Sequence, residues 1–221
     1  MDGLTRQLDA FMAGLLERTD PATAKVLRQT AQALSEAGLL DGALRAGDIA
    51  PDFALPDQSG RVVSLHELLA HGPVVLTFFR GGWCPFCTLA LRALERIRPE
   101  LRRQGAEVVA ISPQTASNAQ ETAERNGLAF PILADHGNAV ARRYGLVWEV
   151  GPEMQAVYQR LGHALPRING TNEWTLPVPA GFVVGRDGRV AYAHVDTRIT
   201  RRLEPAAALA AVRELETGAA K

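Results

Sequence analysis

Two cysteines that stand three residues apart are the residues of this 221-residue chain best suited to chemistry. Cys84 and Cys87 are also its only cysteines. A disulfide across so short a loop is a weak structural staple, because the chain entropy that it removes from the unfolded state shrinks with loop length. In a reducing compartment, such a pair more often serves catalysis or binds a metal. The cysteines therefore indicate redox or metal chemistry.

The residues around the pair place the first cysteine at the head of a helix. An unbroken apolar run at 73–79 predicts a central strand, which a glycine turn connects to a helix at about 85–103. Free backbone N–H groups and the helix dipole stabilise a thiolate there, and the thiolate is the reactive form of cysteine. Cys84 is the predicted nucleophile, in an exposed position. Cys87, one turn deeper and shielded by the helix, is the predicted resolving thiol.

The neighbours of the cysteines each have two interpretations. Arg80 could add positive charge near the thiolate, although an arginine at a strand end is more often a solvated surface group. Trp83 could form a wall along which a substrate approaches, or it could pack on the loop. Gly81 and Gly82 most plainly serve the turn itself.

Metal and nucleotide sites are not expected. Two cysteines supply only half of the four ligands of a zinc site. The five histidines show no pair at helical ligand spacing, and a surface or structural role is predicted for each: His66, His71, His136, His163 and His194. The glycine turn lacks the length and the lysine of a phosphate-binding loop. We therefore expect neither a metal nor a cofactor.

Strands and helices alternate from residue 47 onward, which predicts an α/β fold around a central sheet. Short strands at 53–55 and 61–64 form a hairpin, and the segment 150–175 has no clear period and is interpreted as an insertion with some local helix. Arg186-Asp187-Gly188 predicts a tight hairpin between the last two strands. The other predicted strands are 107–112, 130–134, 181–184 and 189–195, and the other helices are 115–126, 138–144 and 205–216, with a short one from Ser64.

The first forty residues predict a helical hairpin. Apolar residues at three-and-four spacing over 4–16 form one stripe, and Asp20 with Pro21 begins a second helix that ends at Gly38. The stripe is expected to pack on the main domain or on a sister subunit, so a homodimer is possible. We therefore divide the chain into a helical extension, 1–46, and one domain, 47–221.

Composition limits the partners of the chain. Lysine plus arginine and aspartate plus glutamate both number 24, so the net charge is zero and nothing indicates binding to nucleic acid or an anionic membrane. The N-terminus lacks the features of a signal peptide, and no run approaches the roughly 20 apolar residues of a membrane span. A cytoplasmic location is expected.

The motifs resemble known families. The run Trp83-Cys84-Pro85-Phe86-Cys87 after a hydrophobic strand is similar to the active site of thioredoxins and glutaredoxins. The span from Gly47 to about Glu216 resembles the alkyl hydroperoxide reductase and thiol-specific antioxidant family, the peroxiredoxins. The resemblance rests on GDIAPDFAL at 47–55, VVAIS at 108–112, FPILAD at 130–135 and FVVGRDGRV at 182–190. It implies a thioredoxin-like fold with a central mixed sheet flanked by helices.

The resemblance also implies an activity. Cys84 would reduce hydroperoxides, Cys87 would close an intramolecular disulfide, and a donor of the thioredoxin or glutaredoxin type would reduce that disulfide. Pro179 would be a cis-proline facing the cysteines, with exposed backbone that could pair with a substrate chain.

Three positions depart from the family pattern. Peroxiredoxins typically have a threonine or serine three residues before the reactive cysteine and a proline seven before it, where this chain has Gly81 and Thr77. Pro179 stands where a later arginine is expected. Two alternatives to a peroxidase therefore stay open: a thiol-disulfide oxidoreductase acting on protein or glutathione disulfides, and a redox sensor without turnover.

Overall fold

A five-stranded mixed sheet forms the centre of the molecule in the computed structural model, which describes residues 3–218. The strand order is β5-β4-β3-β8-β9. Strand β3 (Val74–Phe78) is parallel to β4 (Glu107–Ser112), and β4 is parallel to β5 (Ile132–Ala134). Strand β8 (Ala180–Val184) is antiparallel to β3 and to β9 (Val190–Val195). The predicted α/β class and mixed sheet are confirmed.

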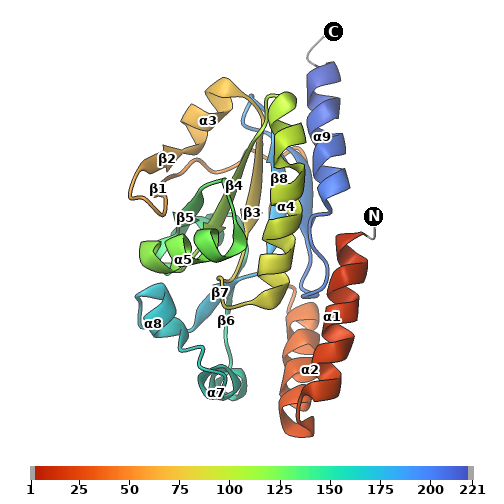
Figure 1. Cartoon of the computed structure of the whole chain (residues 1–221), viewed down its shortest axis with the longest axis vertical. Helices are drawn as coiled ribbons and strands as arrows, with labels where there is room; N and C mark the ends of the chain where they lie inside the picture. Colours follow the sequence, from red (N-terminus) through yellow and green to blue (C-terminus); the bar gives the residue numbers. More distant parts are fainter. Residues whose placement is uncertain (1–2, 219–221) are drawn as a thin grey trace.

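Helices cover both faces of this sheet (Figure 1). Side chains alternate along a strand, so Val75 faces the core under α4 (Pro85–Arg103) while Leu76 faces the opposite core. The first core also includes side chains of α5 (Ala116–Asn126) and α9 (Pro205–Gly218). The second core lies under the short helices α3 (Leu65–His71) and α6 (Ala139–Arg143).

The segment predicted as an insertion forms a small subdomain beside the sheet. It contains α7 (Pro152–Arg160) and α8 (Leu165–Asn169), in agreement with the expected local helix. At its ends, β6 (Val147–Glu149) pairs with β7 (Thr175–Pro177), which sequence analysis did not predict because three-residue strands carry no measurable period. The remaining short elements are β1 (Ala54–Pro56), β2 (Val62–Ser64) and the 3-10 turn η1 (His136–Asn138).

The predicted N-terminal hairpin packs on its own chain. It consists of α1 (Leu4–Arg18) and α2 (Pro21–Glu36), which lie at the lower right of Figure 1. Phe11 of α1 meets Phe86 of α4 edge to face, with ring centroids 5.1 Å apart. Helix α1 therefore packs on α4, and α2 packs on α7. The division of the chain at residue 46 stays a prediction.

The loop between β9 and α9 anchors the hairpin. The Glu204 carboxylate accepts hydrogen bonds from the backbone N–H groups of Leu4, at 3.0 Å, and Thr5, at 2.7 Å. These groups begin α1, which has Gly3 at its N-cap and so lacks a capping side chain of its own. An ion pair of 2.7 Å between Arg201 and Asp9 adds a second connection. The loop thus fixes the position of α1.

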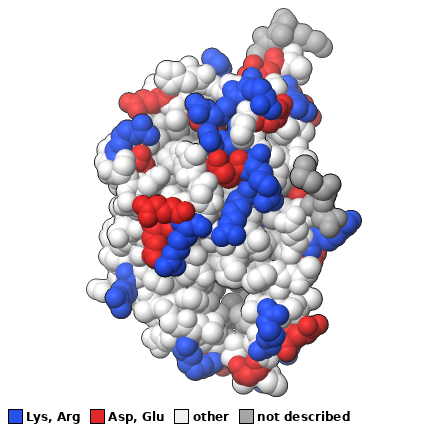
Figure 2. Space-filling view, viewed as in Figure 1, with Lys and Arg blue, Asp and Glu red and all other residues white. Residues whose placement is uncertain are grey.

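Charges of both signs are interspersed on the face that Figure 2 shows. That face carries no large region of a single sign, in keeping with the zero net charge of the chain. Among the described residues, no helix combines the length and the apolar character that crossing a membrane requires.

Candidate active site

The two cysteines lie where a buried strand turns into a helix. Strand β3 ends at Phe78, and Cys84 is the N-cap of α4, with its carbonyl accepting the N–H of Cys87 at 3.0 Å. The turn between them is tight: a Cβ on Gly82 would lie 2.1 Å from Thr122 Oγ1, so only glycine fits there. This geometry places the Cys84 sulfur at the positive end of the helix, as the sequence predicts.

Both sulfur atoms are buried, and this corrects the prediction of an exposed Cys84. Cys84 is 0% exposed and Cys87 is 1% exposed. The prediction treated the helix head as open to solvent. In the structure, the N-terminal hairpin and the loop before α9 pack near it, and their apolar side chains join the same core cluster as the two cysteines. A reagent must therefore pass these elements to reach Cys84.

Arg80 holds the Cys84 sulfur directly. One terminal nitrogen of its guanidinium donates to Cys84 Sγ at 3.0 Å, and the other donates to the Tyr158 hydroxyl at 3.1 Å. The guanidinium also lies 5.3 Å from the centroid of the Trp83 ring, in cation–π range. Arg80 therefore contacts the cysteine pair and is not a solvated surface group.

Trp83 packs against the Arg80 guanidinium. It is not among the residues that line the cavity of about 120 Å³ next to Arg80. Its ring centroid lies 5.1 Å from that of Tyr158 and 4.9 Å from that of His163. Trp83 also lines a second cavity of about 220 Å³ beside Gly82 and His163, so its two interpretations both stay predictions. Sequence analysis missed Tyr158 and gave His163 no place near the cysteines, since both lie in the segment without a clear period.

A second arginine, Arg202, approaches the cysteines from the loop before α9. It is only 6% exposed, and its Nε and one terminal nitrogen have no hydrogen-bond partner. The other terminal nitrogen donates to the Arg201 carbonyl at 2.9 Å. Sequence analysis missed Arg202, because two successive arginines in a loop look like surface residues.

The surroundings of the two thiols shift their pKa values in opposite directions. Burial by itself raises the pKa of Cys84, but a hydrogen bond from Cys87 and the charges of Arg80 and Arg202 outweigh it and bring this pKa well below the ordinary value. Burial raises the pKa of Cys87, and the hydrogen bond to Cys84 and the charge on Cys84 raise it further. The surroundings therefore favour the thiolate on Cys84 and the neutral thiol on Cys87.

Other titratable groups near the cysteines stay uncharged at neutral pH. Burial raises the pKa of Tyr158, so its hydroxyl is neutral when it accepts the hydrogen bond from Arg80. Burial also lowers the pKa of His163, which leaves its imidazole neutral. The positive charges that act on the sulfur atoms are thus the two arginines.

The prediction of a cis-proline at Pro179 is wrong. The described part of the chain has no cis peptide bond. The preceding residues arrive in extended form, because Thr175–Pro177 pairs with β6 and the Val178 N–H donates to the Leu146 carbonyl at 2.6 Å. A trans bond continues this path into β8. Pro179 is also buried, so it offers no free backbone to a substrate chain.

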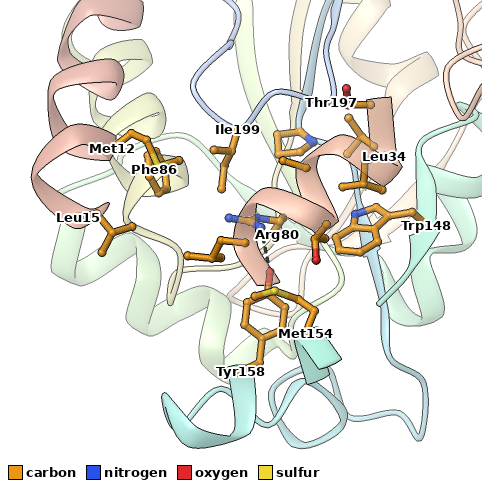
Figure 3. Close-up of a pocket in the computed structure, with 15 residues that line it drawn as sticks. Met12, Leu15, Leu34, Arg80, Phe86, Trp148, Met154, Tyr158, Thr197 and Ile199 are labelled. Atoms are coloured by element: carbon orange, nitrogen blue, oxygen red, sulfur yellow. Dashed lines mark hydrogen bonds between the residues drawn. The ribbon is translucent and has the colours of Figure 1, made fainter. Parts of the chain in front are cut away.

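A cavity of about 120 Å³ lies against Arg80 (Figure 3). Arg80 occupies the centre of the view, with a dashed line to Tyr158, and apolar side chains from the hairpin and from the main domain surround it. Pro179 is among the lining residues. The cavity therefore adjoins the guanidinium that donates to the Cys84 sulfur, whereas Cys84 itself is not among its lining residues.

Comparison with known proteins identifies the family. Residues 46–193 match the model of the AhpC/TSA family, which is about two thirds of the chain. This chain belongs to the AhpC/TSA family. The matched region includes both cysteines and Arg80, whereas the N-terminal hairpin and Arg202 lie outside it.

Two proteins that are similar to this chain have names that state different activities. A chloroplastic peroxiredoxin Q of Triticum aestivum is 34% identical over 109 residues, 49% of this chain and 50% of that protein. The thiol-disulfide oxidoreductase ResA of Halalkalibacterium halodurans is 36% identical over 103 residues, 46% of this chain and 57% of that protein. The matches thus span about half the length of these relatives.

The fold is shared with solved structures. Peroxidoxin BcpB from Mycobacterium tuberculosis gives a TM-score of 0.61 at 24% identity, over 78% of this chain and 98% of that chain. A thioredoxin-like fold of the AhpC/TSA family is therefore confirmed.

Proposed function

We propose that this protein is a thiol-dependent peroxidase in which Cys84 reduces hydroperoxides. The contact of 3.0 Å between the Arg80 guanidinium and Cys84 Sγ carries this proposal. The guanidinium keeps the sulfur ionised and is placed to donate to the oxygen that leaves when the O–O bond breaks. Arg80, with Arg202 behind it, thereby supplies the positive charge for which the family pattern uses a later arginine.

The reaction has three balanced steps. The Cys84 thiolate attacks the terminal oxygen of the hydroperoxide and the O–O bond breaks, so that the terminal oxygen and its hydrogen stay on Cys84 as a sulfenic acid. The departing alkoxide or hydroxide takes a proton from solvent and leaves as alcohol or water. The Cys87 thiol then attacks that sulfur and releases water, which forms the Cys84–Cys87 disulfide. An external dithiol reduces the disulfide by exchange and is itself oxidised to a disulfide.

The proposed partner is a dithiol donor of the thioredoxin or glutaredoxin type, and the proposed compartment is the cytoplasm, where reduced donors are available. A homodimer stays a prediction. Its main support from the sequence, the apolar stripe on α1, is weaker now, because Leu4 and Leu8 of that stripe are buried in the core of their own chain.

Thiol-disulfide exchange is the second candidate function. The Cys-Pro-Phe-Cys spacing and the similarity to ResA support it. Protein disulfides need an exposed attacking sulfur, however, and Cys84 has no accessible surface. In the reduced form that the structure shows, a small oxidant therefore fits this site better than a folded protein, and reduction of the disulfide by a protein dithiol requires that the oxidised form expose a sulfur atom.

The decisive experiment is stopped-flow mixing of the reduced protein with hydrogen peroxide and an organic hydroperoxide, followed by tryptophan fluorescence. Trp83 adjoins Cys84 in the chain, so oxidation should change its emission. We expect oxidation much faster than that of a free cysteine, lost in Cys84→Ser. Cys87→Ser should react equally fast in the first phase and accumulate a sulfenic acid that dimedone traps.

Two results would refute the peroxidase. Oxidation no faster than that of a free thiolate, together with rapid reduction of glutathione disulfide, would establish disulfide exchange. Oxidation of Cys84 without repeated turnover in the presence of a thioredoxin system would instead make the protein a sensor.

A further inference from the structure

The cavity against Arg80 has walls that the peroxidase chemistry alone does not require. The N-terminal hairpin supplies a large part of them: Met12 and Leu15 from α1, and Leu27, Thr30, Ala31 and Leu34 from α2. All lie outside the residues 46–193 that match the AhpC/TSA family. The hairpin thus adds a surface to the site that neither the cysteines nor the arginines need.

The chemistry of the cavity is that of an apolar body with one polar end. The main domain contributes further apolar side chains, among them Phe86, Trp148 and Met154, and Arg80 is the single charged residue of the lining. Figure 3 shows Arg80 among these side chains. Its Nε is buried and has no partner. Such a cavity suits a ligand whose apolar group is covered while its polar group accepts from the guanidinium.

The size of the cavity limits the apolar group. Its volume is about 120 Å³. An engineered apolar cavity of roughly 150 Å³ holds one benzene molecule. The cavity therefore has room for one compact group, such as a branched four-carbon group or a small ring.

We propose that the N-terminal hairpin is the specificity-determining element of this site, selecting organic hydroperoxides that carry one compact apolar group beside the O–O bond over hydrogen peroxide. This inference rests on the proposed peroxidase function. The apolar group lies between α1, α2 and Trp148, while the terminal oxygen reaches Cys84 beside Arg80. After the O–O bond breaks, the same group leaves as an alcohol.

Ala31 offers a direct test, because it is exposed and lines the cavity from α2. Ala31→Phe fills the cavity without changing the core. Because a pocket that loses room for an apolar group loses one or more orders of magnitude in discrimination, we expect kcat/KM for tert-butyl hydroperoxide, whose apolar group has four carbons, to fall about tenfold or more. For hydrogen peroxide, which needs no apolar group in the cavity, it should stay within about twofold.

Ala33→Phe is the matched control. Ala33 is also exposed on α2 but does not line the cavity, so the same substitution there should change kcat/KM for neither peroxide. An equal fall for both peroxides in Ala31→Phe, or no fall for either, would overturn the assignment of the hairpin.

A binding measurement separates this inference from the proposed function. The alcohol tert-butanol has the apolar group of tert-butyl hydroperoxide and no O–O bond. We expect it to change the tryptophan fluorescence of the reduced protein through Trp148, about tenfold more weakly in Ala31→Phe and unchanged in Ala33→Phe. Binding without any peroxide turnover would refute the peroxidase but keep the cavity as a site. Turnover of hydrogen peroxide without binding of the alcohol would overturn the role of the hairpin.

Discussion

Arg80 and Arg202 hold two positive charges beside one pair of sulfur atoms. Burial lowers the pKa of Arg202, and the negative charge of the cysteine pair acts against that effect. A nearby thiolate therefore stabilises the charged form of each guanidinium, and each guanidinium stabilises the thiolate. The acidity of Cys84 depends on both arginines, although only Arg80 donates a hydrogen bond to its sulfur within 3.0 Å.

Removal of the more distant charge should make Cys84 less acidic. We expect Arg202→Gln to raise the pKa of the Cys84 thiol, because its positive charge is among the causes that lower it. Thiolate absorbance near 240 nm, followed against pH, measures the shift. Arg202→Lys, which keeps the charge, should restore most of the acidity. Arg201→Gln removes a neighbouring charge as the control, and an equal shift in that variant would show a nonspecific effect.

Loss of the hydrogen bond to sulfur should slow the chemical step itself. In Arg80→Gln, we expect the rate constant for oxidation by peroxide to fall by about 10²- to 10³-fold, as for the loss of one preorganised donor to a developing charge. Stopped-flow fluorescence measures it. The wild-type rate should also fall as the pH drops through the lowered pKa of Cys84, since the protonated thiol is a poor nucleophile. A rate independent of Arg80 would exclude its catalytic role.

At the scale of elements, the contact between Glu204 and α1 links the hairpin to the site. Burial raises the pKa of Glu204, but hydrogen bonds from Thr5 and Leu4 outweigh it and lower this pKa overall. A carboxylate whose pKa is lower in the folded state stabilises that state fully above its unfolded pKa of about 4.3. This stabilisation is lost as the pH falls through the folded pKa.

Glu204→Ala should therefore destabilise the protein at pH 7 by about 1 kcal/mol, the usual cost of a lost helix cap. Urea unfolding measures the change. The difference from the wild type should shrink as the pH falls below about 4, where the wild-type carboxylate is also protonated. Glu214→Ala, at an exposed position of α9, is the control and should change stability little. A constant difference down to low pH would show that the charge of Glu204 is not what caps α1.

The elements that sequence analysis predicted well are those with local signals. Asp20 accepts from the Thr23 N–H at 2.9 Å as the cap of α2, and the turn at 186–188 joins β8 to β9 as predicted. Pairing of β6 with β7 could not be predicted, because it joins two short segments about 25 residues apart whose residues carry no period. The path that this pairing sets also explains why the expectation for Pro179 failed.

Only part of the candidate site could be predicted from the sequence, again because only local signals can be recognised there. The position of Cys84 at a helix head follows from the adjacent strand, turn and proline, all within ten residues. Burial of Cys84 and the approach of Arg202 depend on segments more than forty residues away in sequence. Only tertiary packing brings these segments together, and no local pattern marks them.

At the scale of the whole molecule, the two arginines make the stability of the fold depend on its oxidation state. The Cys84–Cys87 disulfide carries no charge, so its formation leaves both buried guanidinium groups without the thiolate. A four-residue disulfide loop stabilises by about 2 kcal/mol, whereas a buried charge that loses its partner costs about 3–5 kcal/mol. We expect the oxidised form to be the less stable one.

Thermal unfolding of the reduced and oxidised forms at pH 8 tests this expectation, and the reduced form should have the higher Tm. The lowered pKa of Cys84 means that the thiolate stabilises the fold most above its unfolded pKa of about 8.5 and ceases to do so as the pH falls through the folded pKa. The gap in Tm should therefore narrow toward acidic pH. A higher Tm for the oxidised form at pH 8 would contradict the role of the two arginines.

The part of the cavity wall that the hairpin supplies and the reactive sulfur atoms come from separate stretches of the chain. One contiguous segment before residue 46 supplies the hairpin, whereas both cysteines lie within the part shared with the family. Evolution can therefore exchange the hairpin, or a designer can graft a different one, and change which molecules reach Cys84 without altering the cysteines themselves. The shared domain would thus keep the same thiol chemistry while a different hairpin changed the choice of substrate.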